Sequence, residues 1–259
     1  MTNWKKYITA GLVTVAAAGL LAGCGSTAVS PVSSTASTAA ESTTSSVVSE
    51  TTSAAADENA AAAAQLLNDL TGSYQELWPV ILADEYQQTW LDDCTALVGE
   101  ENAEAAFEKL SSMVTGDVYG EDAVEAYANG GGAYFCGFTN SLATLTFDGE
   151  TSTISGTDKD GNVLFSHTYH YIGMEPVHGL YEFESDDADS GEFTYFFLAP
   201  DTSAETYHIE FRYGSDAEAL SQYDAGEYAY WVASGISTDC DQTMIDNCIE
   251  LFCTENLAG

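Results

Sequence analysis

The sequence predicts a mainly β protein: an antiparallel β-barrel with an N-terminal helical segment before it and a C-terminal helix after it. Two changes in the hydrophobic pattern support this prediction. Apolar residues repeat at helical spacing up to the Gly130-Gly131-Gly132 break, alternate along short segments after it, and return to helical spacing near the C-terminus. About 200 residues take part in this pattern, which is enough for one domain with a sizeable core.

The first 23 residues have the features of a bacterial lipoprotein signal peptide. Lys5 and Lys6 precede an apolar run from Ile8 to Leu21, and the run ends in Leu-Ala-Gly before Cys24. The run is too short and too rich in small residues for a spanning helix. We expect cleavage before Cys24 and acylation of this cysteine, which would anchor the protein to the extracytoplasmic face of the cell membrane.

Residues 24–57 form the predicted stalk. They consist almost entirely of Ser, Thr, Ala and Val with a few Glu residues. Such a composition buries too little apolar surface to offset its ordering entropy, so we expect disorder here. The folded domain is predicted to span residues 58–259.

The charge balance is strongly acidic. The chain has 41 Asp and Glu residues against 5 Lys and Arg, and removal of the signal peptide leaves only Lys109, Lys159 and Arg212 as basic residues. Such a surface repels nucleic acid and raises the local concentration of cations. A divalent metal ion is therefore a partner that this charge favours; alternatively, the charge only keeps the protein soluble and monomeric.

The N-terminal part of the domain is predicted to be helical. Residues 60–70, 74–97 and 101–113 carry apolar side chains three and four positions apart. Near the C-terminus the same spacing recurs from Met244 to Phe252, and Asp239 with Gln242 provides a capping box. We expect this last helix to plug or flank the barrel.

The β-rich part is predicted to contain seven strands joined in a meander. Asp148-Gly149 and Asp160-Gly161 lie between apolar runs, where hairpin turns favour such pairs. We expect these strands to form a closed or nearly closed barrel, because closure leaves no edge strand with unpaired backbone groups. The predicted strands are residues 133–138, 143–147, 151–158, 162–172, 180–183, 193–198 and 207–213.

Two segments resemble the ZinT family of extracytoplasmic zinc- and cadmium-binding proteins. They are AETYHIEFRYGSD at residues 204–216 and LTGSYQELWP at residues 70–79, and the resemblance extends over most of residues 70–252. It implies a lipocalin-like calycin barrel that follows an N-terminal helical segment. It also implies a divalent metal, zinc or a substitute such as cadmium, bound through histidines that include a His-x-His pair on a late strand.

The resemblance places the metal-binding pair in one of two registers. Counting back from Gly214 puts His208 and Glu210 at the pair, whereas alignment on the preceding Ala-Glu puts Thr206 and His208 there. No histidine lies at residues 196–201, where the family has a further one. The metal site is therefore either altered or lost.

The strand pattern also indicates His208 and Glu210 as metal ligands, independently of the family resemblance. They lie two apart on a predicted strand, so both side chains share a face that we expect to line the barrel lumen. Imidazole and carboxylate are both zinc ligands, and His167 and His178 are the further candidates. Arg212 shares that face and is expected to pair with a carboxylate or to hold Glu210 or an anionic ligand.

Other motifs are weak. Five cysteines remain after Cys24, without a C-x-x-C pair, so their disulfide pairing stays open. The sequence has no G-x-S-x-G, H-E-x-x-H or phosphate-loop motif, so we expect no enzyme.

Two hypotheses follow: a lipoprotein that binds zinc in a calycin barrel, or a barrel with a decayed metal site that binds an apolar or peptide ligand or a partner in the cell envelope.

Overall fold

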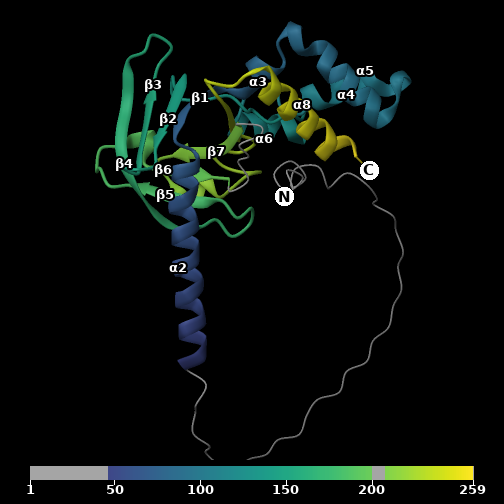
Figure 1. Cartoon of the computed structure of the whole chain (residues 1–259). Helices are drawn as coiled ribbons and strands as arrows, with labels where there is room; N and C mark the ends of the chain where they lie inside the picture. Colours follow the sequence, from purple (N-terminus) through teal and green to yellow (C-terminus); the bar gives the residue numbers. More distant parts are fainter. Residues whose placement is uncertain (1–45, 200–207, 259) are drawn as a thin grey trace, which may run out of the picture.

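The protein is built around a closed antiparallel barrel whose eight strands follow one another in chain order (Figure 1). The computed structural model describes residues 46–199 and 208–258, with side chains from residue 58 onward. The barrel closes because β1 pairs with β8, and every neighbouring pair is antiparallel. This confirms the predicted fold class. The strands are β1 Gly72–Glu76, β2 Thr144–Asp148, β3 Thr153–Thr157, β4 Val163–Met174, β5 Tyr181–Ser185, β6 Tyr195–Leu198, β7 His208–Gly214 and β8 Ala233–Ser237.

Six predicted strands are present, but the two ends of the barrel were predicted wrongly. Residues 133–138 form no named strand; Phe135 makes only isolated bridges to Thr115 and Trp231. Strand β8 was missed, and β1 lies partly inside the helix predicted from residue 74. The reason is non-local pairing: β1 and β8 are short and need each other to complete their ladders.

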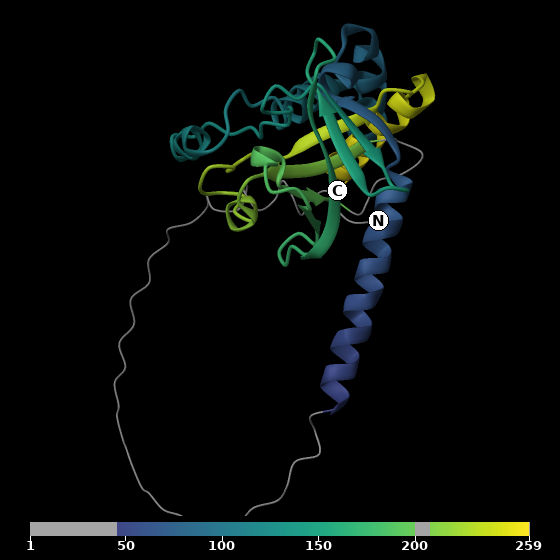
Figure 2. The same ribbon diagram turned by 90° about the vertical axis from the view of Figure 1, so that its left-hand side faces the viewer.

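Helices α3, α4, α5 and α8 gather at one side of the barrel, whereas α2 leads into β1 and projects away from the barrel (Figures 1 and 2). Helices α4 and α5 pack against each other, and α8 packs against both and against α3. The C-terminal helix therefore flanks the barrel. Its N-cap is Asp241, which accepts from the Met244 backbone N–H at 3.0 Å, so the cap predicted at Asp239 is two residues off. The helices are α2 Ser46–Asp69, α3 Leu77–Ile81, η2 Asp84–Tyr86, α4 Gln87–Val98, α5 Glu100–Ser112, α6 Glu121–Ala128, η3 Gly191–Phe193, α7 Ala217–Leu220 and α8 Gln242–Leu257.

Helix α2 begins before the predicted domain boundary. Its backbone is helical from Ser46, so residues 46–57 are helical where the sequence predicted a disordered stalk. Alanines at residues 54–56 and 60–64 favour the helix, and an already formed helix adds further residues at little cost, so it extends towards Ser46. Helix α2 contacts β2 and β4, and its C-terminal half buries Ala63, Leu66 and Leu67. The boundary at residue 58 itself stays a prediction.

No helix in the described parts of the chain combines the length and the apolar composition needed to cross a membrane. Cys24 and the predicted signal peptide lie outside the described residues.

Candidate metal site on the outer face of the barrel

The interior of the barrel is filled by aromatic side chains. Strand β4 alternates between buried Phe165 and Tyr169 and exposed residues such as His170, which defines its inner face. Partners across an antiparallel ladder share a face, so the inner side continues through β5 and β6 to β7. There it is formed by Phe211 and Tyr213, whose rings lie within 6.4 Å of the Phe196 ring.

A glycine shows how tightly the interior is packed. A Cβ atom on Gly156 would lie 2.4 Å from the Leu142 Cδ1 atom and 2.5 Å from the Phe165 ring. Only glycine fits at this point of β3, because its neighbours occupy the space that a side chain would take. Side chains therefore fill the barrel interior at this point of β3.

His208 and Glu210 face outward, which corrects the prediction that they line the lumen. They alternate with Ile209, Phe211 and Tyr213 along β7, and the inner face belongs to the latter three. Both candidates are nevertheless buried, with exposed fractions of 7% and 4%. The physical reason is that an eight-stranded barrel is narrow and its aromatic residues fill it, while helices cover the polar side of β7.

The covering elements are α3 and α8. Together with His208 they line a small, partly open cavity of about 10 Å³. A cavity of this size holds about one water molecule or one small ion. Its lining is mostly apolar, and its potential ligands besides His208 are Cys248 and Glu255 of α8. The lining residues are Leu77, Trp78, Ile81, His208, Cys248, Leu251, Phe252 and Glu255.

Burial keeps His208 uncharged. Desolvation lowers the pKa of its imidazole to about 4, so the ring is neutral at pH 7. Neutral imidazole is the form that binds metals. The pKa of the Cys248 thiol is raised to about 12, first by burial and then by the nearby Glu210 carboxylate. Burial and Glu210 also raise the pKa of Cys136. His208, Glu210 and two thiols thus belong to one buried layer.

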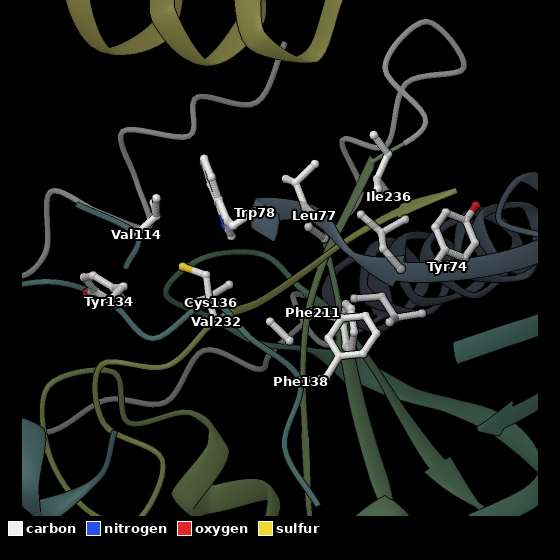
Figure 3. Packing of buried hydrophobic residues seen from close by; sticks show 14 of the residues in the cluster. Tyr74, Leu77, Trp78, Val114, Tyr134, Cys136, Phe138, Phe211, Val232 and Ile236 are labelled. Atoms are coloured by element: carbon white, nitrogen blue, oxygen red, sulfur yellow. The ribbon is translucent and has the colours of Figure 1, made fainter. Parts of the chain in front are cut away.

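Figure 3 shows the neighbourhood of this layer. Trp78 and Cys136 lie with Val114 and Tyr134 on one side of the strands, whereas Phe138 and Phe211 lie on the barrel side. Helix α8, drawn in yellow, passes above Trp78. The Trp78 ring contacts the Phe252 ring of α8 with the centroids 4.8 Å apart. The cover over His208 is therefore built from packed aromatic side chains.

Arg212 makes main-chain contacts that the sequence did not predict, and Glu175 is a carboxylate that interacts with it electrostatically. It is fully buried, its guanidinium lies 4.1 Å from the centre of the Tyr223 ring, and it donates hydrogen bonds to the main-chain carbonyls of Leu220, Gln222 and Tyr228. These contacts fasten the segment between β7 and β8 to the outside of the barrel. Arg212 is therefore a structural anchor of that segment.

His178 lies in the loop between β4 and β5 and not on a strand. Its ring contacts Tyr223 with the centroids 3.8 Å apart, and its Nδ1 atom lies 3.4 Å from the Glu175 carboxylate. Burial alone would raise the pKa of Glu175, but hydrogen bonds from His178 and from the Val177 backbone N–H lower it. The sequence predicted His178 but gave no sign of its partners Glu175 and Tyr223.

His167 is the fourth predicted ligand and lies on the inner side of β4, near Ile154. Its Nδ1 atom is 2.8 Å from the Asp187 carboxylate. His170 points to the opposite, exposed side and lies 2.7 Å from Asp186. The prediction that these two histidines occupy opposite faces is confirmed.

The four predicted ligands do not meet at one point. Residues 46–199 and 208–258 contain no group of three or more His, Cys, Asp or Glu side chains arranged to hold a metal ion. Only His208 and Glu210 share a face, and Thr206, the alternative ligand, lies outside the described residues. Sequence reasoning missed Cys248 and Glu255 as neighbours of His208. The sequence placed Cys248 on the apolar face of the last helix, but it did not show that this helix covers His208.

A second hollow lies beside the candidate site. It is an open groove of about 370 Å³ between the start of the helical segment and residues 114–116 and 135–137. The Glu76 carboxylate lies at the groove and accepts a hydrogen bond from the Phe138 backbone N–H at 2.6 Å. The groove is otherwise largely apolar. Its lining residues are Glu76, Trp78, Pro79, Leu82, Val114, Thr115, Gly116, Phe135, Cys136 and Gly137.

Comparisons with known proteins yield structural neighbours only. No family model matches the sequence, and no curated protein matches it. One neighbour is the Zn(II)-bound ZinT-like domain of Streptococcus pneumoniae AdcA, 15% identical with a TM-score of 0.44, over 70% of this chain and 87% of that domain. Another is Zn(II)-bound AdcA of the same organism, 16% identical with a TM-score of 0.40, over 71% of this chain and 34% of AdcA. The chain thus spans about a third of AdcA.

Proposed function

We propose that this protein is a divergent ZinT-like lipoprotein that binds zinc, or a related divalent metal such as cadmium, at His208 and Glu210. One observation carries the proposal. A neutral, buried imidazole borders a cavity the size of a single ion, and a carboxylate shares its strand face. Such a cavity suits an ion and excludes organic ligands.

The ligand chemistry favours zinc over calcium or magnesium. Zinc accepts nitrogen, sulfur and oxygen ligands in tetrahedral geometry, whereas calcium and magnesium prefer oxygen alone. His208 and Glu210 supply two of the four positions. Because the described side chains hold no ready set of three ligands, binding must draw a further group from α8 towards His208. Cys248 and Glu255 line the same cavity and are the candidates.

The proposed location follows from the N-terminal sequence. Cleavage before Cys24 and acylation of its thiol would hold the domain at the extracytoplasmic face of the membrane. The excess of acidic residues, 41 Asp and Glu against 5 Lys and Arg in the full chain, would concentrate cations around the domain. The proposal assigns no catalytic role.

Calorimetric titration of the purified protein with zinc tests this function. We expect about one zinc ion per chain with a dissociation constant below micromolar. His208→Ala should weaken zinc binding by at least roughly 10-fold to 100-fold. This is the loss typical of substituting residues that only orient the metal ligands. His170→Ala is the matched control, because His170 is an exposed histidine on a different strand, β4. Absence of heat with a folded protein would contradict the proposal.

Glu210→Gln distinguishes the two registers of the resemblance. If Glu210 is a ligand, removal of its charge weakens zinc binding. If Thr206 and His208 form the pair instead, the same change leaves zinc affinity unaltered. Equal affinities for wild type, His208→Ala and Glu210→Gln would show that the metal binds elsewhere or that the site has decayed.

The groove beside Trp78 supports a second candidate function, the binding of an apolar or peptide ligand from the cell envelope. Its volume of about 370 Å³ lies in the range of small-molecule sites, and its walls are largely apolar. A neutral apolar dye such as Nile red tests this function. Saturable binding that is lost in Leu82→Asp, together with the absence of zinc binding, would favour the second candidate over the first.

A further inference from the structure

Two cysteines meet in the helical layer beside the barrel. Cys94 in α4 and Cys253 in α8 are 159 residues apart in sequence, and their sulfur atoms lie 4.0 Å apart. Both side chains are fully buried. The two helices pack directly against each other, so the sulfurs face across a helix–helix interface.

The other cysteines of the described residues have different surroundings. Cys136 contacts Ser234 and Trp78 on the outside of the barrel, and Cys248 borders the His208 cavity. Cys240 lies before α8 and is partly exposed. The contact between the Cys94 and Cys253 sulfurs is set by the packing of α4 on α8.

We propose that Cys94 and Cys253 form an intrachain disulfide when the protein meets an oxidant of the disulfide class. One thiol, as thiolate, attacks the oxidant and forms a mixed disulfide, releasing one thiol of the oxidant. The second cysteine then attacks the mixed disulfide and releases the other thiol. Two cysteine thiols are oxidised to one disulfide, and one disulfide of the oxidant is reduced to two thiols.

The geometry requires only a small movement. A disulfide needs the sulfurs about 2.0 Å apart, and the two sulfurs already touch with no side chain between them. The remaining gap of about 2 Å would be closed by rotation of the two side chains together with a small shift of the helices that carry them. The proposed bond would join segments near the start and the end of the domain, and a loop of this length gives a large entropic effect on the unfolded chain.

Burial determines when the bond forms. Desolvation raises the pKa of both Cys94 and Cys253, and the thiolate is the reactive form. The folded, reduced protein should therefore oxidise slowly. Oxidation is expected while α8 is still undocked, during folding outside the cytoplasm or during local opening of the helix.

The disulfide would fix the cover over the His208 cavity. Helix α8 carries Cys253 and also Cys248, Leu251, Phe252 and Glu255 of the cavity lining. A covalent link to α4 holds this side of the cavity in place. The inference does not rest on metal binding, because the sulfur contact lies in the helix interface whether or not a metal binds.

The direct test is to map disulfides in the full chain. The reduced, unfolded protein is refolded in glutathione redox buffer, free thiols are blocked with iodoacetamide, and the product is cleaved at acidic residues and analysed by mass spectrometry. We expect one linked peptide pair that contains Cys94 and Cys253, two hydrogen masses lighter than the two free peptides. Alkylation of both residues, or linkage of either to another cysteine, would overturn the proposal.

Thermal unfolding gives an independent readout. The oxidised wild type should melt at least about 5 °C higher than the protein kept in reductant. Cys94→Ala/Cys253→Ala should remove this difference, whereas Cys240→Ser should retain it. If the double variant fails to fold, the wild-type mapping still decides the question. Zinc titration of both redox forms separates this result from the proposed function. A mapped disulfide without zinc binding would contradict the proposed zinc-binding function and leave the disulfide proposal intact.

Discussion

The two faces of strand β7 are both buried, but by different means. The inner face carries Phe211 and Tyr213, which pack against other aromatic rings inside the barrel. The outer face carries His208, Glu210 and Arg212, which lie beneath helices and loops. Adjacent residues of one strand therefore serve two separate purposes.

The contrast shows where function can reside in this fold. Apolar burial inside the barrel stabilises the protein without further requirements. Burial of His208 and Glu210 instead carries a desolvation cost that a well-packed apolar face would avoid. His208 borders a small cavity and Glu210 shares its strand face, which is why we propose the function on the outer face and place the main source of stability on the inner face.

The largest expected effect is on the inner face. Phe211→Ala removes a fully buried ring from the interior and should lower the free energy of unfolding by about 3–5 kcal/mol. Chemical denaturation measures this change. An effect below about 1 kcal/mol would show that the interior is loosely packed, and the contrast between the faces would fail.

The outer face should respond to pH. The folded-state pKa of His208 is about 4, below the unfolded value of about 6.5, so the unfolded state binds more protons between these values. Stability should therefore fall as the pH drops from about 6.5 to about 4, by about 3 kcal/mol in total. The difference in unfolding free energy between wild type and His208→Gln, measured against pH in the presence of chelator, isolates this contribution. A pH-independent difference would mean that His208 is not buried as a neutral ring.

Arg212 tests the comparison between the two faces, because it is a charged residue of the outer face whose contacts stabilise the fold. Arg212→Met keeps much of the apolar stem and removes the hydrogen bonds to Leu220, Gln222 and Tyr228. We expect a loss of about 2–3 kcal/mol in unfolding free energy, and no change in the zinc affinity of the folded protein. A loss of zinc binding without loss of stability would instead make Arg212 part of the metal site.

The smallest effect concerns the start of α8. Asp241 caps this helix by accepting from the Met244 backbone N–H. Asp241→Ala should lower the unfolding free energy by about 1 kcal/mol. Asp239→Ala is the matched control from the position that the sequence favoured, and a larger effect there than at Asp241 would contradict the observed cap.

The sequence predicted the barrel because its central strands carry their own signal. β4 alternates clearly between inward Phe165 and Tyr169 and outward His170, and Gly161 takes the positive φ of 82° that the predicted turn requires. β8 has no such signal: Ala233–Ser237 contains small residues, and its identity as a strand depends on β1 and β7. Pairing between distant segments is invisible to a local pattern.

The candidate site was predicted only in part, for a related reason. The spacing of His208 and Glu210 correctly placed both on one face of β7. Which face points inward depends on the neighbouring strands and helices, and β7 is buried on both sides. Cys248 and Glu255 approach His208 only because α8 folds back over the barrel wall.

The most direct test of the central claim is an NMR titration of the His208 imidazole. The claim predicts that its ring signals stay constant from pH 8 to pH 5, because the ring remains neutral, and that one equivalent of zinc shifts them while the His170 signals stay unchanged. Titration of His208 near its ordinary pKa of about 6.5, or ring signals that zinc leaves unaltered, would contradict the assignment of the metal site to the outer face of β7.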